Sequence, residues 1–237
     1  MHVLITGISS GIGAELAREY LDRGDTVFGI SRNPNRELEN RERFYYLQQD
    51  LAEFENLRYY VYLFLEGIHT LDLVILNAGI LPEIKDMRDT SLNEIQDVMK
   101  VNVWANKILL DVLFESVGVI HQVVAISSGA ARSGSRGWNA YSLSKATLNM
   151  LIELYSQEMD KTKLYAIAPG IIDTNMQEHI AGISREEADK FPVIQRLQRM
   201  KGTADMPPAS EVAAMLADTF EKAMEYESGS FLDVRDM

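Results

Sequence analysis

Short runs rich in apolar, β-branched and aromatic residues alternate along the chain with longer segments of helical periodicity. Strands that are apolar along their length are buried on both faces, and strands joined through helices pair in parallel. The alternation therefore predicts an α/β fold that is doubly wound, with a mainly parallel sheet flanked by helices. The strand-like runs span residues 2–6, 26–30, 44–50, 71–76, 121–127, 163–168 and 230–234.

Helical periodicity fills the intervals between these runs. The last helix follows two prolines, and Ser210 is expected to be its N-cap. The stretch from about 175 to 209 fits no strand position and is expected to be an insertion over one edge of the sheet. No internal repeat or low-complexity linker divides the chain, so residues 1–237 are predicted to form one domain. The expected helices span residues 12–23, 53–66, 91–117, 138–159 and about 210–225.

The composition argues against several classes of partner. The net charge is 23 − 35 = −12, and an acidic surface repels nucleic-acid phosphates. The chain has no cysteine for a disulfide, nucleophile or metal ligand, and its four histidines show no ligand spacing, so no metal site is expected. The apolar runs are far shorter than the roughly 20 residues that span a bilayer. With no targeting segment before the first strand, a soluble, cytoplasmic protein is expected, without nucleic-acid or membrane partners.

The segment TGISSGIG, residues 6–13, joins the first strand to the first helix and contains three glycines. A backbone that turns tightly here brings the N–H groups and the positive dipole end of the helix to a pyrophosphate. The glycine-rich turn and the helix N-terminus would thus hold a phosphate despite the acidic net charge. The order of strand, turn and helix favours dinucleotide binding in a Rossmann-type fold over a glycine-rich turn that binds nothing.

The second strand ends in GISRNP, at the place where dinucleotide-binding folds read the adenosine ribose. An Asp or Glu there hydrogen-bonds the 2′-hydroxyl and repels a 2′-phosphate, whereas this chain has Ser31 and Arg32. A guanidinium offers two parallel hydrogen bonds to a phosphate. The sequence thus favours NADP(H) over NAD(H), with the alternative that Arg32 is only a charged residue of a surface loop.

Seven motifs follow one another between residue 6 and about residue 176: TGISSGIG, QQDL, LNAG, VNV, AISSGA, YSLSK and APGIIDTNM. In this order they resemble the short-chain dehydrogenase/reductase family. The resemblance implies that a nicotinamide dinucleotide lies along them. The residues that it implies for cofactor binding are Gly7, Ser9, Ser10, Gly11, Ile12, Gly13, Ser31, Arg32, Asp50, Leu51, Asn77, Ala78, Gly79, Tyr141, Lys145, Pro169, Gly170, Ile172 and Thr174.

Tyr141 and Lys145 lie four residues apart in NAYSLSK, residues 139–145, and would share one face of a helix. A cation within about 4–6 Å favours the phenolate, so Lys145 is expected to lower the tyrosine pKa from about 10 toward neutrality. Such a phenol can donate a proton to a carbonyl that receives a hydride. Taken alone, the pair also fits a packed tyrosine beside a solvated lysine.

The family resemblance implies a catalytic tetrad of Asn102, Ser128, Tyr141 and Lys145. Ser128 stands thirteen residues before Tyr141, the usual family spacing, and would polarise the substrate carbonyl. Asn102 would hold a water that links Lys145 to solvent. The three tetrad residues other than Tyr141 also have purely structural interpretations. Ser128 could cap the end of a strand, Asn102 could be a hydrogen-bonded polar group of a helix, and Lys145 could be a solvated cation.

Three stretches bear on the substrate. SSGAARSGSRGWNAY and DTNMQ are most similar to the benzil reductase and sepiapterin reductase branch, while SGSFLDVRDM replaces the glycine-rich end of many members. Ser128, Trp138 and Tyr141 are expected to contact the substrate, under a cover formed by the region 175–209. Trp138 either stacks on an aromatic substrate or simply packs.

These features predict an NADPH-dependent carbonyl reductase for a small ketone or diketone, benzil-like or sepiapterin-like, with Tyr141 as proton donor. The alternatives are a 3-oxoacyl-type reductase and a catalytically silent NADP(H)-sensing regulatory protein. The absent glycine-rich end argues mildly against the first, and the complete tetrad argues against the second. Apolar helix faces at 103–114 and 141–155, together with the resemblance, favour a homodimer or homotetramer.

Overall fold

The computed structural model describes all residues, Met1–Met237. Its strands are β1 (His2–Thr6), β2 (Thr26–Ser31), β3 (Phe44–Gln48), β4 (Thr70–Leu76), β5 (Val119–Ile126), β6 (Lys163–Ala168) and β7 (Phe231–Asp233). They form one sheet in the order β3-β2-β1-β4-β5-β6-β7, and every neighbouring pair is parallel. The predicted doubly wound α/β fold is confirmed, and the sheet is parallel throughout rather than mainly so. The strand order reverses between β1 and β4, and open α/β sheets bind ligands at such a point, beyond the carboxyl ends of the strands.

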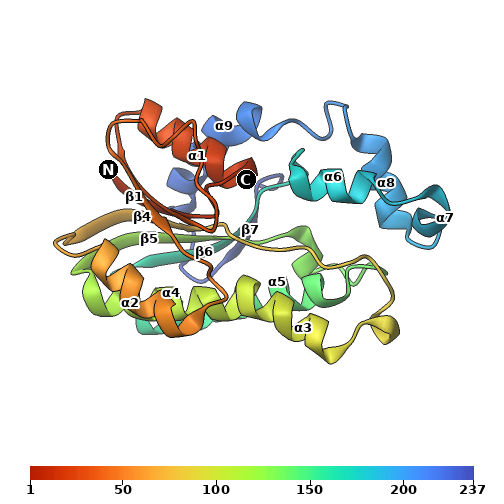
Figure 1. The fold of residues 1–237 in the computed structure, drawn as a ribbon, viewed down its shortest axis with the longest axis horizontal. Helices are drawn as coiled ribbons and strands as arrows, with labels where there is room; N and C mark the ends of the chain where they lie inside the picture. Colours follow the sequence, from red (N-terminus) through yellow and green to blue (C-terminus); the bar gives the residue numbers. More distant parts are fainter.

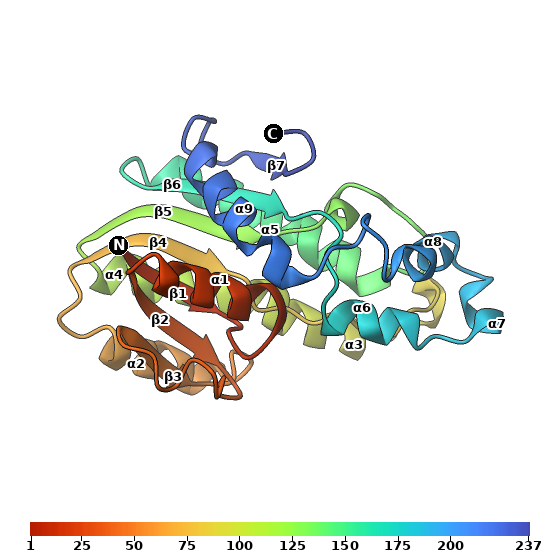
Figure 2. The same ribbon diagram turned by 90° about the horizontal axis from the view of Figure 1, so that it is seen from above.

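The α-helices are α1 (Gly11–Asp22), α2 (Phe54–Phe64), α3 (Leu92–Met99), α4 (Ala105–Ser116), α5 (Asn139–Glu158), α6 (Asn175–Ala181), α7 (Arg185–Ala188), α8 (Pro192–Met200) and α9 (Ala209–Ala223). α1 and α9 cover one face of the sheet, and α2, α4 and α5 cover the other (Figure 1). A further group, α6 to α8, extends beyond the carboxyl ends of the strands (Figure 2). None of these helices combines the length and apolar character needed to cross a membrane.

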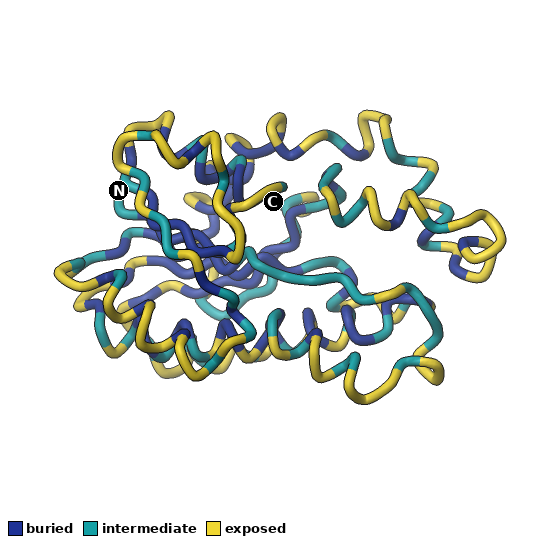
Figure 3. The backbone as a smooth tube through the Cα atoms, viewed as in Figure 1, coloured by how far each residue is buried: buried dark blue, intermediate teal, exposed yellow.

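Alternate residues of the strands contribute to two separate cores. In β1, Val3 and Ile5 pack with α1 and α9, whereas Leu4 faces the helices of the opposite side. All three side chains are fully buried. Most residues of the central strands are buried as well (Figure 3), whereas the edge strand β3 has no buried residue. Burial on both faces explains why the strands read as continuous apolar runs rather than alternating ones.

Apart from shifts of one or two residues at helix ends, two features of the helices differ from the prediction. The helical region expected at 91–117 is interrupted by a π-helical turn, Lys100–Trp104, between α3 and α4. This turn contains Asn102, whose buried side chain bonds to the loop after β4 and holds the wider turn in place. The N-cap of α9 is Pro208 and not Ser210, because the extended backbone at Pro208 lets the helix begin at the next residue.

The segment 175–209 consists of α6, α7, α8, the turns that join them to each other and to α9, and the first residue of α9. We call it the lobe. A separate apolar cluster holds the lobe against the rest of the molecule, and its buried members are Ala130, Trp138, Tyr141, Ile180, Ala188, Phe191, Ile194, Leu197 and Met206. The expected insertion is therefore helical, and it lies at the edge where the strands end.

β1 and β4 are joined at their carboxyl ends through a buried threonine. The Thr6 hydroxyl oxygen accepts hydrogen bonds from the backbone N–H groups of Asn77 and Ala78, both at 3.0 Å. The Asn77 side chain returns through Nδ2 to the carbonyl oxygens of Thr6, at 3.0 Å, and Gly7, at 3.3 Å. The segments that follow the two strands are thus held side by side.

Replacing Thr6 with valine keeps the shape of the side chain and removes the acceptor of the Asn77 and Ala78 N–H groups, which are partly buried. We expect Thr6→Val to lower the free energy of unfolding by about 1–3 kcal/mol, the cost of a donor that loses its partner away from water. Thr219→Val is the matched control, since the buried Thr219 hydroxyl donates within its own helix, to Met215. Chemical denaturation measures both variants, and equal losses would contradict the role assigned to Thr6.

Candidate active site

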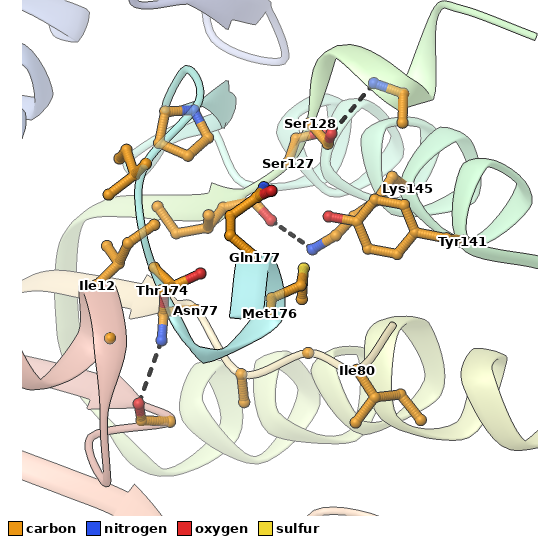
Figure 4. A pocket seen from close by; sticks show the side chains of 18 of the residues that line it. Ile12, Asn77, Ile80, Ser127, Ser128, Tyr141, Lys145, Thr174, Met176 and Gln177 are labelled. Carbon is orange, nitrogen blue, oxygen red and sulfur yellow. Dashed lines mark hydrogen bonds between the residues drawn. The ribbon is translucent and has the colours of Figure 1, made fainter. Parts of the chain in front are cut away.

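A cavity of about 660 Å³ lies at the carboxyl ends of the strands, between the sheet and the lobe (Figure 4). It brings together nearly all the residues that the sequence predicted for the site. Only Gly13 and Asn102 of that set do not line it. The predicted residues that do are Gly7, Ser9, Ser10, Gly11, Ile12, Ser31, Arg32, Asp50, Leu51, Asn77, Ala78, Gly79, Ser128, Trp138, Tyr141, Lys145, Pro169, Gly170, Ile172 and Thr174.

The glycine-rich loop borders one part of the cavity. α1 begins at Gly11, and its N-cap Ser10 makes no side-chain capping bond to the first turn. Gly7 and Gly11 adopt φ angles of +78° and +63°, where a side chain would be strained. A Cβ on Gly13 would collide with the Gly7 carbonyl oxygen, so Gly13 lets α1 pack against the loop from behind. An open cradle of glycines at a helix N-terminus fits the pyrophosphate of a dinucleotide.

Ser31 and Arg32 lie at the end of β2, where they line the cavity together with Asp50. The Ser31 hydroxyl donates to the Asn33 carbonyl oxygen at 2.7 Å. Asp50 accepts a hydrogen bond from the Ala52 N–H at 2.9 Å. Arg32 is exposed and forms no ion pair, so its guanidinium is free to bind an anion.

Tyr141 and Lys145 lie in the first two turns of α5 and point into the cavity (Figure 4). Lys145 Nζ donates to the Ile126 carbonyl oxygen at 2.7 Å and lies 5.8 Å from the centroid of the Tyr141 ring. Burial disfavours the charged form and lowers the pKa of Lys145 to about 8. The ammonium is therefore still the main form at neutral pH.

The pKa of Tyr141 does not follow the expectation from the sequence. Burial raises it, and the opposing effect comes from a hydrogen bond with the Ser128 side chain rather than from Lys145. The reason lies in the lysine, whose ammonium is itself desolvated and directs a proton toward Ile126. The phenol in this structure thus keeps its proton firmly and has Ser128 as its polar neighbour.

Asn102 lies behind the cavity wall and links three segments. Its Oδ1 accepts from the Ile80 N–H at 2.8 Å, and its Nδ2 donates to the Ile80 carbonyl oxygen at 3.0 Å and to Ser144 Oγ at 2.9 Å. Ser144 Oγ in turn donates to the Tyr141 carbonyl oxygen at 2.8 Å. Both amide hydrogens of Asn102 are used within the protein, and the side chain ties the start of α5 to the loop after β4.

Trp138 packs in the interior and also lines the cavity. It is 9% exposed and belongs to the apolar cluster that holds the lobe, yet it also lines the cavity. Its ring centroid lies 5.7 Å from that of Tyr141, with the planes tilted by 45°. The preceding Gly137 has a φ of +98°, in a tight turn that packs against Phe191 of the lobe. Trp138 therefore packs between the tyrosine and the lobe and still borders the space for a substrate.

Two arginines complete the wall and were not predicted. Arg196 belongs to α8, and Arg235 follows β7 near the end of the chain. Neither lies in a motif, so motif comparison gives no reason to choose them. The departure of SGSFLDVRDM from the usual family ending was the one signal that pointed toward Arg235.

Known proteins resemble this chain in both sequence and fold. The family described as short chain dehydrogenase matches residues 1–182. A benzil reductase ((S)-benzoin forming) from Bacillus subtilis is 29% identical over 244 residues, which cover 98% of each chain. A sepiapterin reductase from Meriones unguiculatus is 29% identical over 181 residues, covering 72% of this chain and 65% of its own. The predicted similarity to this branch is confirmed.

The fold comparison agrees with the sequence comparison. The crystal structure of a short chain dehydrogenase/reductase from Saccharomyces cerevisiae matches the present structure with a TM-score of 0.83 at 25% identity. The match covers 98% of this chain and 95% of the yeast protein. A match of this extent includes the lobe as well as the sheet.

Proposed function

Because the chain belongs to the short-chain dehydrogenase family, and is thus an oxidoreductase that binds a nicotinamide cofactor, we propose that it is an NADPH-dependent carbonyl reductase. Its substrate would be a small ketone or diketone. The observation that carries the proposal is the convergence of Ser128, Tyr141 and Lys145 on the cavity that also holds the glycine-rich loop. Residues 1–237 would act as one NADP-binding unit, with the lobe as the cover of the substrate.

The catalytic side chains divide the work of carbonyl reduction. When bound, the dinucleotide supplies a hydride for the carbonyl carbon. Ser128 donates a hydrogen bond to the carbonyl oxygen, where negative charge develops. Tyr141 gives its proton to that oxygen. Lys145, which donates to the Ile126 carbonyl oxygen in this structure, would turn its ammonium toward the phenolate that is left and stabilise it. Because the pKa of Lys145 is about 8, this stabilisation is available at neutral pH.

Asn102 is a positioning residue in this scheme. Through Ile80 and Ser144 it fixes the first turn of α5, and with it the backbone of Tyr141. The proposal also includes the water that the family resemblance implies near Asn102, which would return protons to Lys145 from solvent.

We further propose that the cofactor is NADP(H) rather than NAD(H). Arg32 is exposed without an ion-pair partner, and no carboxylate follows β2 at the position that would repel a 2′-phosphate. Asp50 also lines the cavity, after β3, and the family resemblance implies that it contacts the adenine. Arg32 would supply the bidentate contact and Ser31 a further donor.

An aromatic substrate fits the surroundings of the proton donor. Trp138 borders the cavity beside Tyr141, and the lobe contributes further apolar side chains, among them Met176 and Leu197. The benzil reductase from Bacillus subtilis acts, by its name, on an aromatic diketone. We therefore favour a diketone with at least one ring.

We also propose a homodimer or homotetramer that forms through α4 and α5. Large apolar side chains are exposed on this side of the molecule: Trp104, Leu143, Met150 and Leu154. Burial of such residues between subunits would remove them from water.

Replacing Tyr141 with phenylalanine removes the proposed proton donor with little change in shape. We expect kcat for a ketone such as benzil to fall at least about 100-fold, because general acid catalysis contributes roughly 10²–10⁴ in rate. NADPH consumption measures kcat, and fluorescence titration shows whether NADPH is still bound. Tyr59→Phe, on the exposed face of α2, is the matched control. Unchanged kcat in Tyr141→Phe would contradict the assignment, and tight NADPH binding without turnover of any ketone would favour the regulatory alternative.

Replacing Arg32 with alanine tests the cofactor preference. The ratio of kcat/KM for NADPH to that for NADH is expected to fall about tenfold or more, the effect of losing a charged hydrogen bond. Arg36→Ala removes a charge from the same exposed loop, outside the cavity, and should leave the ratio unchanged. A wild-type enzyme that prefers NADH would refute the proposal directly.

A further inference from the structure

Three arginines gather where the cavity meets the lobe. Arg196 and Arg235 line the main cavity, and together with Arg199 they line an adjoining recess of about 510 Å³. Ile171 also borders both spaces, so the recess continues from the cavity. These arginines lie at the lobe, whereas Arg32, the proposed contact of the cofactor phosphate, follows β2.

The charge in this region is positive, although the chain as a whole has a net charge of −12. Arg196 and Arg199 are exposed and form no ion pair. Arg235 pairs with Asp233, through Nε at 2.8 Å and Nη2 at 2.5 Å, which fixes its guanidinium. Asp205 is the one carboxylate among the residues that line the recess. Two arginine charges are thus left without a carboxylate partner on an otherwise acidic molecule.

The positive region begins beside the proposed reaction site. Arg235 Nη2 lies 3.5 Å from the point where a Cβ would stand on Gly129, the residue after Ser128. Asp50, which lies beside Arg32, is the one carboxylate that lines the main cavity. A substrate bound at Ser128 that extends toward the recess therefore passes arginines, and no carboxylate lines that part of the main cavity. Such an arrangement attracts and orients an anionic group.

We propose that the substrate is an anionic carbonyl compound, whose carboxylate or phosphate is bound in the recess by Arg196 and Arg199, while Arg235, held by Asp233, lies between the recess and the reaction site. The inference rests on the carbonyl reductase function proposed above and names its substrate class. Hydride adds to the carbonyl carbon and the Tyr141 proton adds to the oxygen, so that an alcohol forms and the anionic group is unchanged. A neutral diketone uses the same catalytic residues and leaves the arginines without a role.

Three aryl ketones that share one alkyl chain and end in a carboxylate, a phosphonate or a neutral amide provide the test. With NADPH saturating, kcat/KM for the better anionic ketone is expected to exceed that for the amide by about tenfold or more, the effect of a charged hydrogen bond. Arg196→Gln and Arg199→Gln should each reduce this ratio, and the double variant should bring it close to one. Arg185→Gln is the matched control, because Arg185 is exposed on the same lobe and lines neither space.

The outcomes separate this inference from the function on which it rests. Equal kcat/KM for the anionic and neutral ketones would overturn the inference and leave the reductase function intact, whereas no reduction of any ketone would overturn both. Weaker NADPH binding in Arg196→Gln with an unchanged ratio would assign the arginines to the cofactor and contradict the inference. If kcat/KM depended on the arginines only for a ketone attached to an acidic carrier protein, the arginines would bind that protein. This result would also contradict the inference. Thermal melting of each variant confirms that the fold is retained.

Discussion

A chain of hydrogen bonds joins the glycine-rich loop to the helix that bears the proposed proton donor, and both parts of the site depend on it. The chain starts at the Thr6 hydroxyl, which binds the backbone of Asn77 after β4. A few residues further on, the peptide groups of Ile80 bond to the side chain of Asn102. Asn102 then reaches Ser144 in α5, one residue before the lysine of the site. Thr6, Asn102 and Ser144 are themselves buried, so leaving the polar group of any of them without its partner is costly.

The electrostatics of the site run against those of the whole protein. A net charge of −12 would repel a phosphorylated cofactor and an acidic substrate alike. Positive groups nevertheless line the cavity and the recess. They are the N-terminus of α1, Arg32 at the end of β2, and Arg196 and Arg199 of α8. In our proposal the first two serve the dinucleotide and the last two serve the substrate. Specific placement of a few cations thus outweighs the average charge.

The sequence predicted the sheet and most of the cavity because both are encoded locally. Each strand is one apolar run, and each cofactor segment is one short motif that follows a strand, so their positions along the chain determine their places at the sheet edge. The π-helical turn at Asn102 was missed, because its width depends on bonds to Ile80, twenty-two residues away. The pKa of Tyr141 was misjudged for a similar reason, since it depends on burial by the lobe rather than on the lysine four residues later.

The arginine group shows the limit of prediction from local patterns. Arg196 and Arg235 lie 235 − 196 = 39 residues apart and belong to no common motif, and they meet only because the lobe and the C-terminal segment close over the same cavity. The N-cap of α9 was displaced by two residues for a simpler reason, since the fixed φ of Pro208 begins the helix before Ser210 is reached. The first case depends on which distant segments fold together, and the second on the backbone conformation of a neighbouring residue. Composition and motif spacing contain neither.

In our proposal one cavity holds NADP(H), with its adenosine phosphate at Arg32 and its nicotinamide beside Tyr141. A crystal structure of the protein with NADP⁺ tests it most directly. We expect the 2′-phosphate within hydrogen-bonding distance of Arg32, the pyrophosphate at the N-terminus of α1, and the nicotinamide ring between Tyr141 and Thr174. A dinucleotide whose phosphate lies on Arg196 and Arg199, or whose nicotinamide lies away from Tyr141, would contradict it.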